Sequence, residues 1–176
     1  SITANGQASL VGGVATFSNL TIVALPGENQ RLSFTLDGNF QNSANQAVSS
    51  SASNEISVTF NDPHKLALIQ QPSANAVTAE LLAVQPKVVI QDFYGNTVSN
   101  YVGSVFVQSQ NGSRLVGPSD ETISSLSALV VNGVATFTSV RIQGPANSGY
   151  ALDFNSGALQ STTSNPVVLT HTTAHS

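Results

Sequence analysis

The chain of 176 residues is long enough for one or two domains, and 40% of its residues are hydrophobic, which suffices for a core. Only 8% of the residues are charged, against about 25% in an ordinary soluble domain, and a net charge of −4 with five Lys and Arg argues against a nucleic-acid partner. The absence of cysteine excludes disulfides and thiolate metal sites, and no apolar run approaches the roughly 20 residues of a membrane span.

A segment near the start of the chain recurs later in the sequence. Residues 11–34 align without a gap with residues 131–154, at an offset of 120. The five residues Gly-Val-Ala-Thr-Phe are identical in both copies, from Gly13 to Phe17 and from Gly133 to Phe137. Repetition at the length of a domain is typical of an array of similar modules.

The first copy, in residues 1–62, is interpreted as the C-terminal half of a module. Its last two strands are expected at residues 30–36 and 55–60, with a loop at 39–53 between them. The apolar residues expected to face a core with one side absent are Ala15, Phe17, Leu20, Ile22, Leu32, Phe34, Ile56 and Val58. Monomers rarely expose so large an apolar patch. Either upstream sequence or strands of a neighbouring chain would cover this face, and we favour upstream sequence.

Residues 63–170 are expected to form a complete module, with a tail or the start of the next linker at 171–176. No helical periodicity is sustained, and short β-branched and aromatic runs alternate with Gly, Asn, Pro and Ser. This pattern is typical of an all-β fold, here an immunoglobulin-like β-sandwich. The expected strands are residues 65–69, 86–91, 102–108, 115–116, 123–131, 134–142, 150–154 and 167–169.

A turn is expected from Asp92 to Asn96. The Asp92 side chain can cap this turn, and Gly95 and Asn96 tolerate a positive φ. Structural roles are also expected for Gly13 and Gly133 in the repeated motif, together with Phe17 and Phe137 that end it.

The expected strand at 134–142 changes phase halfway along. Ala135 and Phe137 share one face, whereas Val140 and Ile142 are one residue out of step with them. Strict alternation would place the second pair on the opposite face. A β-bulge at Thr138–Ser139 would return both pairs to the core, and the first copy has the same shift.

No catalytic residue is assigned from the sequence. His64, His171 and His175 have no plausible carboxylate partner by spacing, and the adjacent Asp120 and Glu121 would point to opposite faces of a strand. Catalysis needs a nucleophile with a base, or paired carboxylates, within reach of one another. We therefore expect a chain that is not an enzyme.

Calcium is the most plausible metal, because it binds carboxylate, amide and carbonyl oxygens. Asn61, Asp62 and Asp92 could meet at the junction end of the complete module. The alternative is that the two aspartates simply organise turns, and no other cofactor is expected. The junction Asn61–Pro63 is short and stiffened by proline, which predicts a semi-rigid rod of modules.

Two Asn-x-Ser/Thr sequons occur, at Asn19 and at Asn111. Sequons mark possible N-glycan acceptors on exported chains, and glycans would keep a nearly uncharged surface soluble. The alternative is that both sequons arise by chance in a chain so rich in Asn and Ser.

Several blocks of the sequence resemble a known family. These are residues 85–92 (Gln-Pro-Lys-Val-Val-Ile-Gln-Asp), Gly95-Asn96-Thr97-Val98, Leu115-Val116-Gly117 and the motif from Gly133 to Phe137. In this order they resemble bacterial-type immunoglobulin-like repeats of large exported surface proteins, including invasin/intimin-type adhesins and multi-repeat filaments. The resemblance implies an extracellular, cell-surface protein whose modules mostly serve as spacers or building blocks.

The function expected from these observations is structural: a building block of a stalk, filament or sheath. Its partners would be copies of itself or adjacent repeat modules, joined by strand complementation or end-to-end packing. The alternative is an adhesin or carbohydrate-binding module that uses the aromatic turn around Phe93, Tyr94 and Tyr101. A third possibility, an accessory domain of an exported enzyme, has no residue that argues for it.

Overall fold

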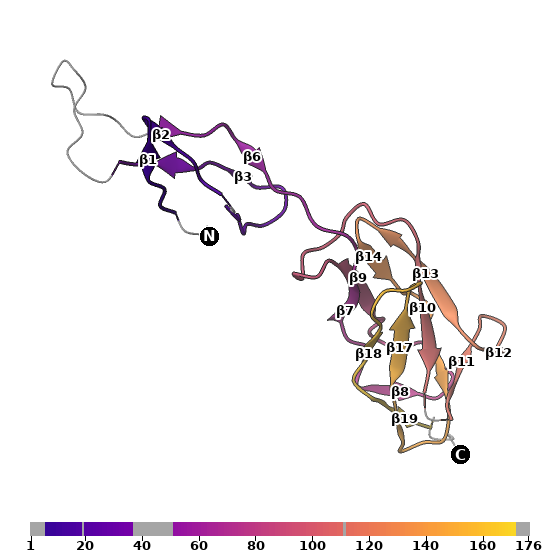
Figure 1. The fold of residues 1–176 in the computed structure, drawn as a ribbon. Coiled ribbons are helices and arrows are strands. Elements are labelled where there is room, and N and C mark those ends of the chain that lie inside the picture. Colours follow the sequence, from indigo (N-terminus) through magenta and orange to yellow (C-terminus); the bar gives the residue numbers. More distant parts are fainter. Residues whose placement is uncertain (1–5, 19, 37–50, 111, 172–176) are drawn as a thin grey trace. The chain divides into compact units, whose positions relative to one another are not determined.

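The computed structural model describes residues 6–18, 20–36, 51–110 and 112–171, and within these ranges it contains strands and turns but no helix (Figure 1). The expected all-β class is confirmed. It follows that the described part of the chain holds no helix that is long and apolar enough to cross a membrane. The chain divides into two compact units, the first unit (residues 1–60) and the second unit (residues 61–176).

The main sheet of the second unit has seven strands in the order β18-β17-β10-β13-β14-β9-β7, with every neighbouring pair antiparallel (Figure 1). The strands are β7 Lys65–Gln70, β9 Lys87–Gln91, β10 Ser104–Ser109, β13 Leu126–Val131, β14 Val134–Thr136, β17 Leu152–Asn155 and β18 Thr162–Thr163. Its two edges meet, because Lys65 forms a parallel bridge with Gln160 and the backbone N–H of Leu66 donates to the Gln160 carbonyl at 2.9 Å. The sheet therefore curls around a single interior.

Two smaller sheets complete the second unit. The first has the order β12-β11-β15 and is antiparallel; its strands are β12 Thr122–Ile123, β11 Arg114–Val116 and β15 Ile142–Gln143. The other has the order β16-β19-β8; its strands are β16 Gly149–Tyr150, β19 Val167–Thr170 and β8 Asn75–Val77. In that sheet β19 runs antiparallel to β16 and parallel to β8.

The core of the second unit draws on strands of all three sheets. Its largest side chains that are at most 2% exposed are Phe137, Phe154, Ile90, Leu115, Ile142, Leu152, Leu169, Val88, Val98, Val105, Val107 and Val140. The rings of Phe137 and Phe154 meet edge-on, with centroids 5.5 Å apart. Burial of each such side chain stabilises the fold by roughly 1.5–3 kcal/mol, so one interior holds the three sheets together.

The phase change in residues 134–142 has a different cause from the expected bulge. Ala135, Phe137, Val140 and Ile142 are all at most 2% exposed, so both pairs do face the core. However, β14 ends at Thr136, and the chain then crosses to a different sheet, where β15 pairs with β11. The prediction of a bulge in one continuous strand is therefore wrong, because the chain changes sheets instead.

A glutamine side chain supports this crossing. Gln85 Oε1 accepts from the backbone N–H of Val140 at 2.8 Å, and Gln85 Nε2 donates to the Val140 carbonyl at 3.2 Å. The amide thus gives the Val140 N–H an acceptor outside a sheet, while the Val140 carbonyl also accepts from the backbone N–H of Leu82 at 3.1 Å.

The described residues of the first unit form three two-stranded pairs. These join β1 Leu10–Val11 to β2 Val14–Ala15, β3 Asn29–Gln30 to β6 Ile56–Ser57, and β4 Ser33–Phe34 to β5 Ser51–Ala52. Strand β5 falls inside residues 39–53, where a loop was expected, so that prediction is wrong at residues 51–52. The rest of the expected loop up to residue 50 lies outside the described residues.

The β1–β2 hairpin of the first unit repeats the β13–β14 hairpin of the second. Leu10 pairs with Ala15 in one, and Val130 pairs with Ala135 in the other, at the same offset of 120. Both turns have two residues at positive φ, with values of 58° and 81° for Gly12-Gly13 and of 50° and 79° for Asn132-Gly133. This geometry matches the two-residue type I′ hairpin turn that Gly and Asn favour.

The other two strand pairs of the first unit also have counterparts in the second unit. Gln30 pairs with Ile56 as Tyr150 pairs with Val167. The pair β4–β5 corresponds in the same way to the pair β17–β18. In both correspondences the residue numbers differ by 120 for the first strand of the pair and by 111 for the second strand. The two copies thus share register as well as sequence, and the first is longer between these strands.

Even a side-chain hydrogen bond recurs between the copies. The backbone N–H of Leu32 donates to Ser53 Oγ at 2.9 Å, and that of Leu152 donates to Ser164 Oγ at 3.0 Å. Both serine hydroxyls in turn donate to the carbonyl of the next residue.

Candidate functional site

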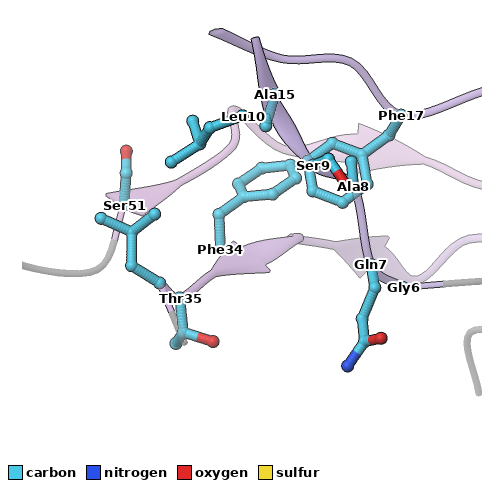
Figure 2. A pocket seen from close by; sticks show the side chains of 11 residues that line it. Gly6, Gln7, Ala8, Ser9, Leu10, Ala15, Phe17, Phe34, Thr35 and Ser51 are labelled. Carbon is cyan, nitrogen blue, oxygen red and sulfur yellow. The ribbon is translucent and has the colours of Figure 1, made fainter. Parts of the chain in front are cut away.

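The first unit presents an open hollow of about 910 Å³ on its inner face (Figure 2). Its lining residues are Gly6, Gln7, Ala8, Ser9, Leu10, Ala15, Phe17, Phe34, Thr35, Leu36 and Ser51. Figure 2 shows the rings of Phe17 and Phe34 turned toward the same space, and their centroids are 5.3 Å apart. None of the lining residues is charged, so the hollow is suited to an apolar partner.

Equivalent positions in the two units differ sharply in burial. Leu10 is 45% exposed, whereas its counterpart Val130 is 7% exposed. Phe17 is half-buried, whereas its counterpart Phe137 is 2% exposed. All the fully buried hydrophobic residues of the described chain lie in the second unit, from Leu66 to Leu169. Among its described residues, the first unit therefore has the face of a core without the cover.

The cover in the second unit comes from the strands before β13. Strand β9 pairs with β14 through Val88 and Ala135, and β10 lies between β13 and β17. The described residues of the first unit include no counterpart of β7, β9 or β10, so β2 pairs there with β1 alone. The first unit thus offers strand edges as well as an apolar face, the two features that β-augmentation uses.

The glycines of the repeated motif also differ in how closely other segments pack against them. At Gly133, with φ of +79°, an added Cβ would lie 2.8 Å from the Val98 carbonyl oxygen. At Gly13, with φ of +81°, an added Cβ would meet nothing within 4 Å. The two glycines share a conformation, but only Gly133 is closely packed against another segment.

Asp92 organises the turn that follows β9. It is fully buried, and its Oδ1 accepts from the backbone N–H of Asn96 at 2.8 Å. Its Oδ2 accepts from Asn96 Nδ2 at 3.0 Å and from the backbone N–H of Asn61 at 3.0 Å. Gly95 has a φ of +91° in this turn. The carboxylate thereby ties the turn to the first residue of the second unit.

These hydrogen bonds hold the pKa of the Asp92 carboxyl below its usual value. Burial raises this pKa, and the N–H of Asn61, the side-chain amide of Asn96 and the N–H groups of Asn96 and Tyr94 lower it. Hydrogen bonds to the charged form favour ionisation. The buried group is therefore a carboxylate at neutral pH.

Two of the three calcium candidates, Asp92 and Asn61, are engaged in other ways, and the third, Asp62, is exposed. Both Asp92 oxygens accept from N–H donors, and Asn61 Oδ1 accepts from the backbone N–H of Asp62 at 3.1 Å. Within the described ranges, no three His, Asp or Glu side chains are grouped so that they could hold a metal ion. This geometry matches the turn-organising alternative, and calcium binding stays a prediction.

Two of the three expected aromatic residues form an exposed cluster. Phe93 is 66% and Tyr94 is 74% exposed, and their rings meet edge-on with centroids 5.3 Å apart. His64 joins them, with its ring 5.3 Å from that of Phe93. The backbone of His64 is placed there because its N–H donates to the Gln91 carbonyl at 2.8 Å. Sequence reasoning missed His64, because only this long-range backbone bond brings it to the turn.

Tyr101 does not share the exposure of this pair. Its hydroxyl is 2.8 Å from Ser156 Oγ, and its ring lies against Gly103, where an added Cβ would be 2.9 Å from the ring. Tyr101 is therefore half-buried and tied to the strands.

Both sequon asparagines, Asn19 and Asn111, lie outside the described residues. The residue after Asn111 is Gly112, which is exposed. Glycosylation stays a prediction at both positions.

Comparison with known proteins gives distant structural similarity alone. No protein-family model matches the chain, and no curated protein matches it. A β-glycosidase from Bacteroides vulgatus is similar in structure, with a TM-score of 0.46 and 12% sequence identity. The similarity covers 90% of this chain and 20% of the glycosidase chain. This chain thus corresponds to about one fifth of the length of that protein.

Proposed function

We propose that this chain is a structural, non-catalytic segment of an extracellular repeat protein that forms a stalk, filament or sheath on the cell surface. One observation carries the proposal: the first unit repeats the strand register of the second unit but leaves the equivalent inner face open. Such a face gains a core only by associating with another segment. Association is therefore part of how the chain folds and works.

The topology of the second unit supports an immunoglobulin-like module. Antiparallel strands enclose one core, and the early strand β8 pairs in parallel with the late strand β19. Tyr150 donates its hydroxyl hydrogen to the Pro145 carbonyl at 3.1 Å. A tyrosine bonded to the backbone a few residues upstream is a hallmark of immunoglobulin sandwiches.

The surface of the second unit supports lateral packing. Val102 is 93% exposed, Leu129 67% and Val131 61%, on a chain with only 8% charged residues. Low charge reduces the repulsion between closely packed neighbours, and exposed apolar side chains favour contact between them.

The test is negative-stain electron microscopy of the native, unfragmented protein together with its mass. Long, regular fibres are expected, with a mass far above the 18.1 kDa of this chain, because each open face requires a neighbour. Compact, monodisperse particles of 18.1 kDa would contradict the structural proposal.

The exposed aromatic pair favours a second candidate function, binding of polysaccharide at the Phe93–Tyr94 turn. Exposed rings flanked by polar groups can stack on the apolar faces of sugar rings, because Phe and Tyr present a large apolar surface. The Asn96 side chain and His64 supply the polar surroundings. Tyr101 contributes less to such a surface, because it is half-buried.

For this candidate, the double variant Phe93→Ala/Tyr94→Ala is expected to adsorb to insoluble polysaccharide at least about tenfold more weakly, since it loses two stacking rings. Pull-down with a panel of cell-wall polysaccharides measures the effect. Val102→Ala is the matched control, since Val102 is exposed but lies outside the cluster. Equal adsorption of all three proteins, or none by any of them, would remove the binding function.

A further inference from the structure

We infer that the open inner face of the first unit binds the front half of another module of the same type, a segment that corresponds to residues 61–120. Residues 61–120 are called the front half of the second unit. The inference rests on the proposed repeat function and names the partner that the open face takes. It follows from three properties of the second unit, where such a front half is in place.

The first property is the backbone register. In the second unit, β9 pairs with β14 through Val88 and Ala135, and the counterpart of Ala135 is Ala15 in β2. Strand β10 pairs with β13 and with β17, whose counterparts are β1 and β4. In the described part of the first unit, β1 pairs only with β2 and β4 only with β5. The edges that receive a front half are thus present in the same register.

The second property is the shape of the face. Five inward positions carry identical residues in the two units, namely Ala15/Ala135, Phe17/Phe137, Ile22/Ile142, Leu32/Leu152 and Phe34/Phe154. The two phenylalanine pairs have nearly equal centroid distances, 5.3 Å and 5.5 Å. Because interiors are packed like crystals, a face of the same shape fits a cover of the same shape.

The third property is charge. The hollow is lined by uncharged residues. The front half of the second unit covers the equivalent face with buried apolar residues, among them Leu66, Val88, Ile90, Val105 and Val107. Its one buried charge, among the described residues, is Asp92, whose oxygens are satisfied within its own turn. Contact between the two faces therefore leaves no charge without a partner.

A second copy of this chain does not fit the requirement as well. Each copy has one front half and two back halves, so a copy that donated residues 61–120 would open its own second unit. The exchange would leave the number of open faces unchanged. The occupant is therefore an additional front half.

The experiment places a duplicate of residues 61–120 directly before Ser1 of the full chain, which keeps the offset of 120 between the copies. Hydrogen exchange with mass spectrometry then compares the extended and unmodified chains. In the extended chain, amides at residues 14–17 and 32–34 are expected to exchange roughly a hundredfold more slowly or better, because a covered core must open before they exchange. Amides of the second unit, at residues 134–137 and 152–154, serve as the internal reference for a folded module.

The matched control carries Val88→Asp and Val105→Asp in the duplicated segment only. These substitutions place charges where the cover is apolar, so the first unit should lose the added protection while the second unit keeps its own. This control separates packing of the duplicate from a general effect of a longer chain.

Two results would overturn the inference. One is rapid exchange at residues 14–17 and 32–34 in the extended chain while the second unit remains protected. The other is a stable dimer of the unmodified chain in which these same amides are protected, since a second copy would then be the occupant. Failure here leaves the structural function open, because fibres of the native protein could form by end-to-end packing. Compact native particles would remove that function without affecting this result.

Discussion

Phe137→Ala is expected to lower the free energy of unfolding of the second unit by about 3–5 kcal/mol, the usual cost of removing a buried phenylalanine ring. Phe137 is 2% exposed and contacts Phe154 edge-on at 5.5 Å, so its loss leaves a cavity at the centre of the core. Urea unfolding monitored by tyrosine fluorescence measures the change. This signal reports on the second unit alone, because the chain has no Trp and its three tyrosines are Tyr94, Tyr101 and Tyr150.

Phe106→Ala is the matched control, because Phe106 lies in the same unit but is 43% exposed. Its removal is expected to cost less than about 1 kcal/mol, as is usual for a partly exposed side chain away from the core. Equal losses for the two variants would show that the ring of Phe137 does not pack in the core.

Asp92→Asn is expected to destabilise the second unit by about 2–3 kcal/mol at pH 7, because hydrogen bonds to a charged group contribute more than neutral ones. The variant replaces one of the two carboxylate oxygens by an NH₂ group, which cannot accept from the N–H donors of Asn61 and Asn96 that now meet these oxygens. The same tyrosine-monitored urea unfolding measures the loss. Asp62→Asn is the control, since Asp62 is exposed and belongs to the same junction; a loss as large as that of Asp92→Asn would disprove a specific role for the buried carboxylate.

The pH dependence of Asp92 has a definite sign. Its pKa is lowered in the folded state, so the ionised group stabilises the fold above the ordinary aspartate pKa of about 3.9. This contribution is lost as the pH falls through the lowered pKa. The urea concentration at the unfolding midpoint of the unmodified chain should therefore decrease when the pH is lowered below about 4. In Asp92→Asn this decrease should be smaller. An unchanged pH dependence in the variant would assign the fall to other carboxyl groups.

Local patterns in the sequence were sufficient to predict most strands of the second unit. Short apolar runs mark β7, β9 and β10, and alternating apolar residues mark β17; the observed ends differ from the expected ones by about two residues or fewer. The turn at Asp92 could also be predicted, because the side chains of Asp and Asn bond to nearby backbone groups and Gly tolerates a positive φ.

The features that sequence reasoning missed depend on contacts between distant segments. Strand β8 was not expected, because its three residues are recognisable only through parallel pairing with β19. The crossing after Thr136 looked like a bulge, because both devices restore the same inward faces and differ only in which strand lies next to Ile142. The contact of His64 with Phe93 could not be predicted for the same reason.

The parallel pairing of β8 and β19 has a mechanical consequence. Asn75, Ala76 and Val77 lie opposite Val168, Leu169 and Thr170, with the backbone N–H of Thr78 bonded to the Thr170 carbonyl at 2.9 Å. Because β8 lies near the start of the module and β19 near its end, tension on the chain pulls the two strands in opposite directions along their shared axis. All their hydrogen bonds are then loaded together instead of opening one after another. A module built in this way resists stretching at a pair of strands that lies close to both of its ends.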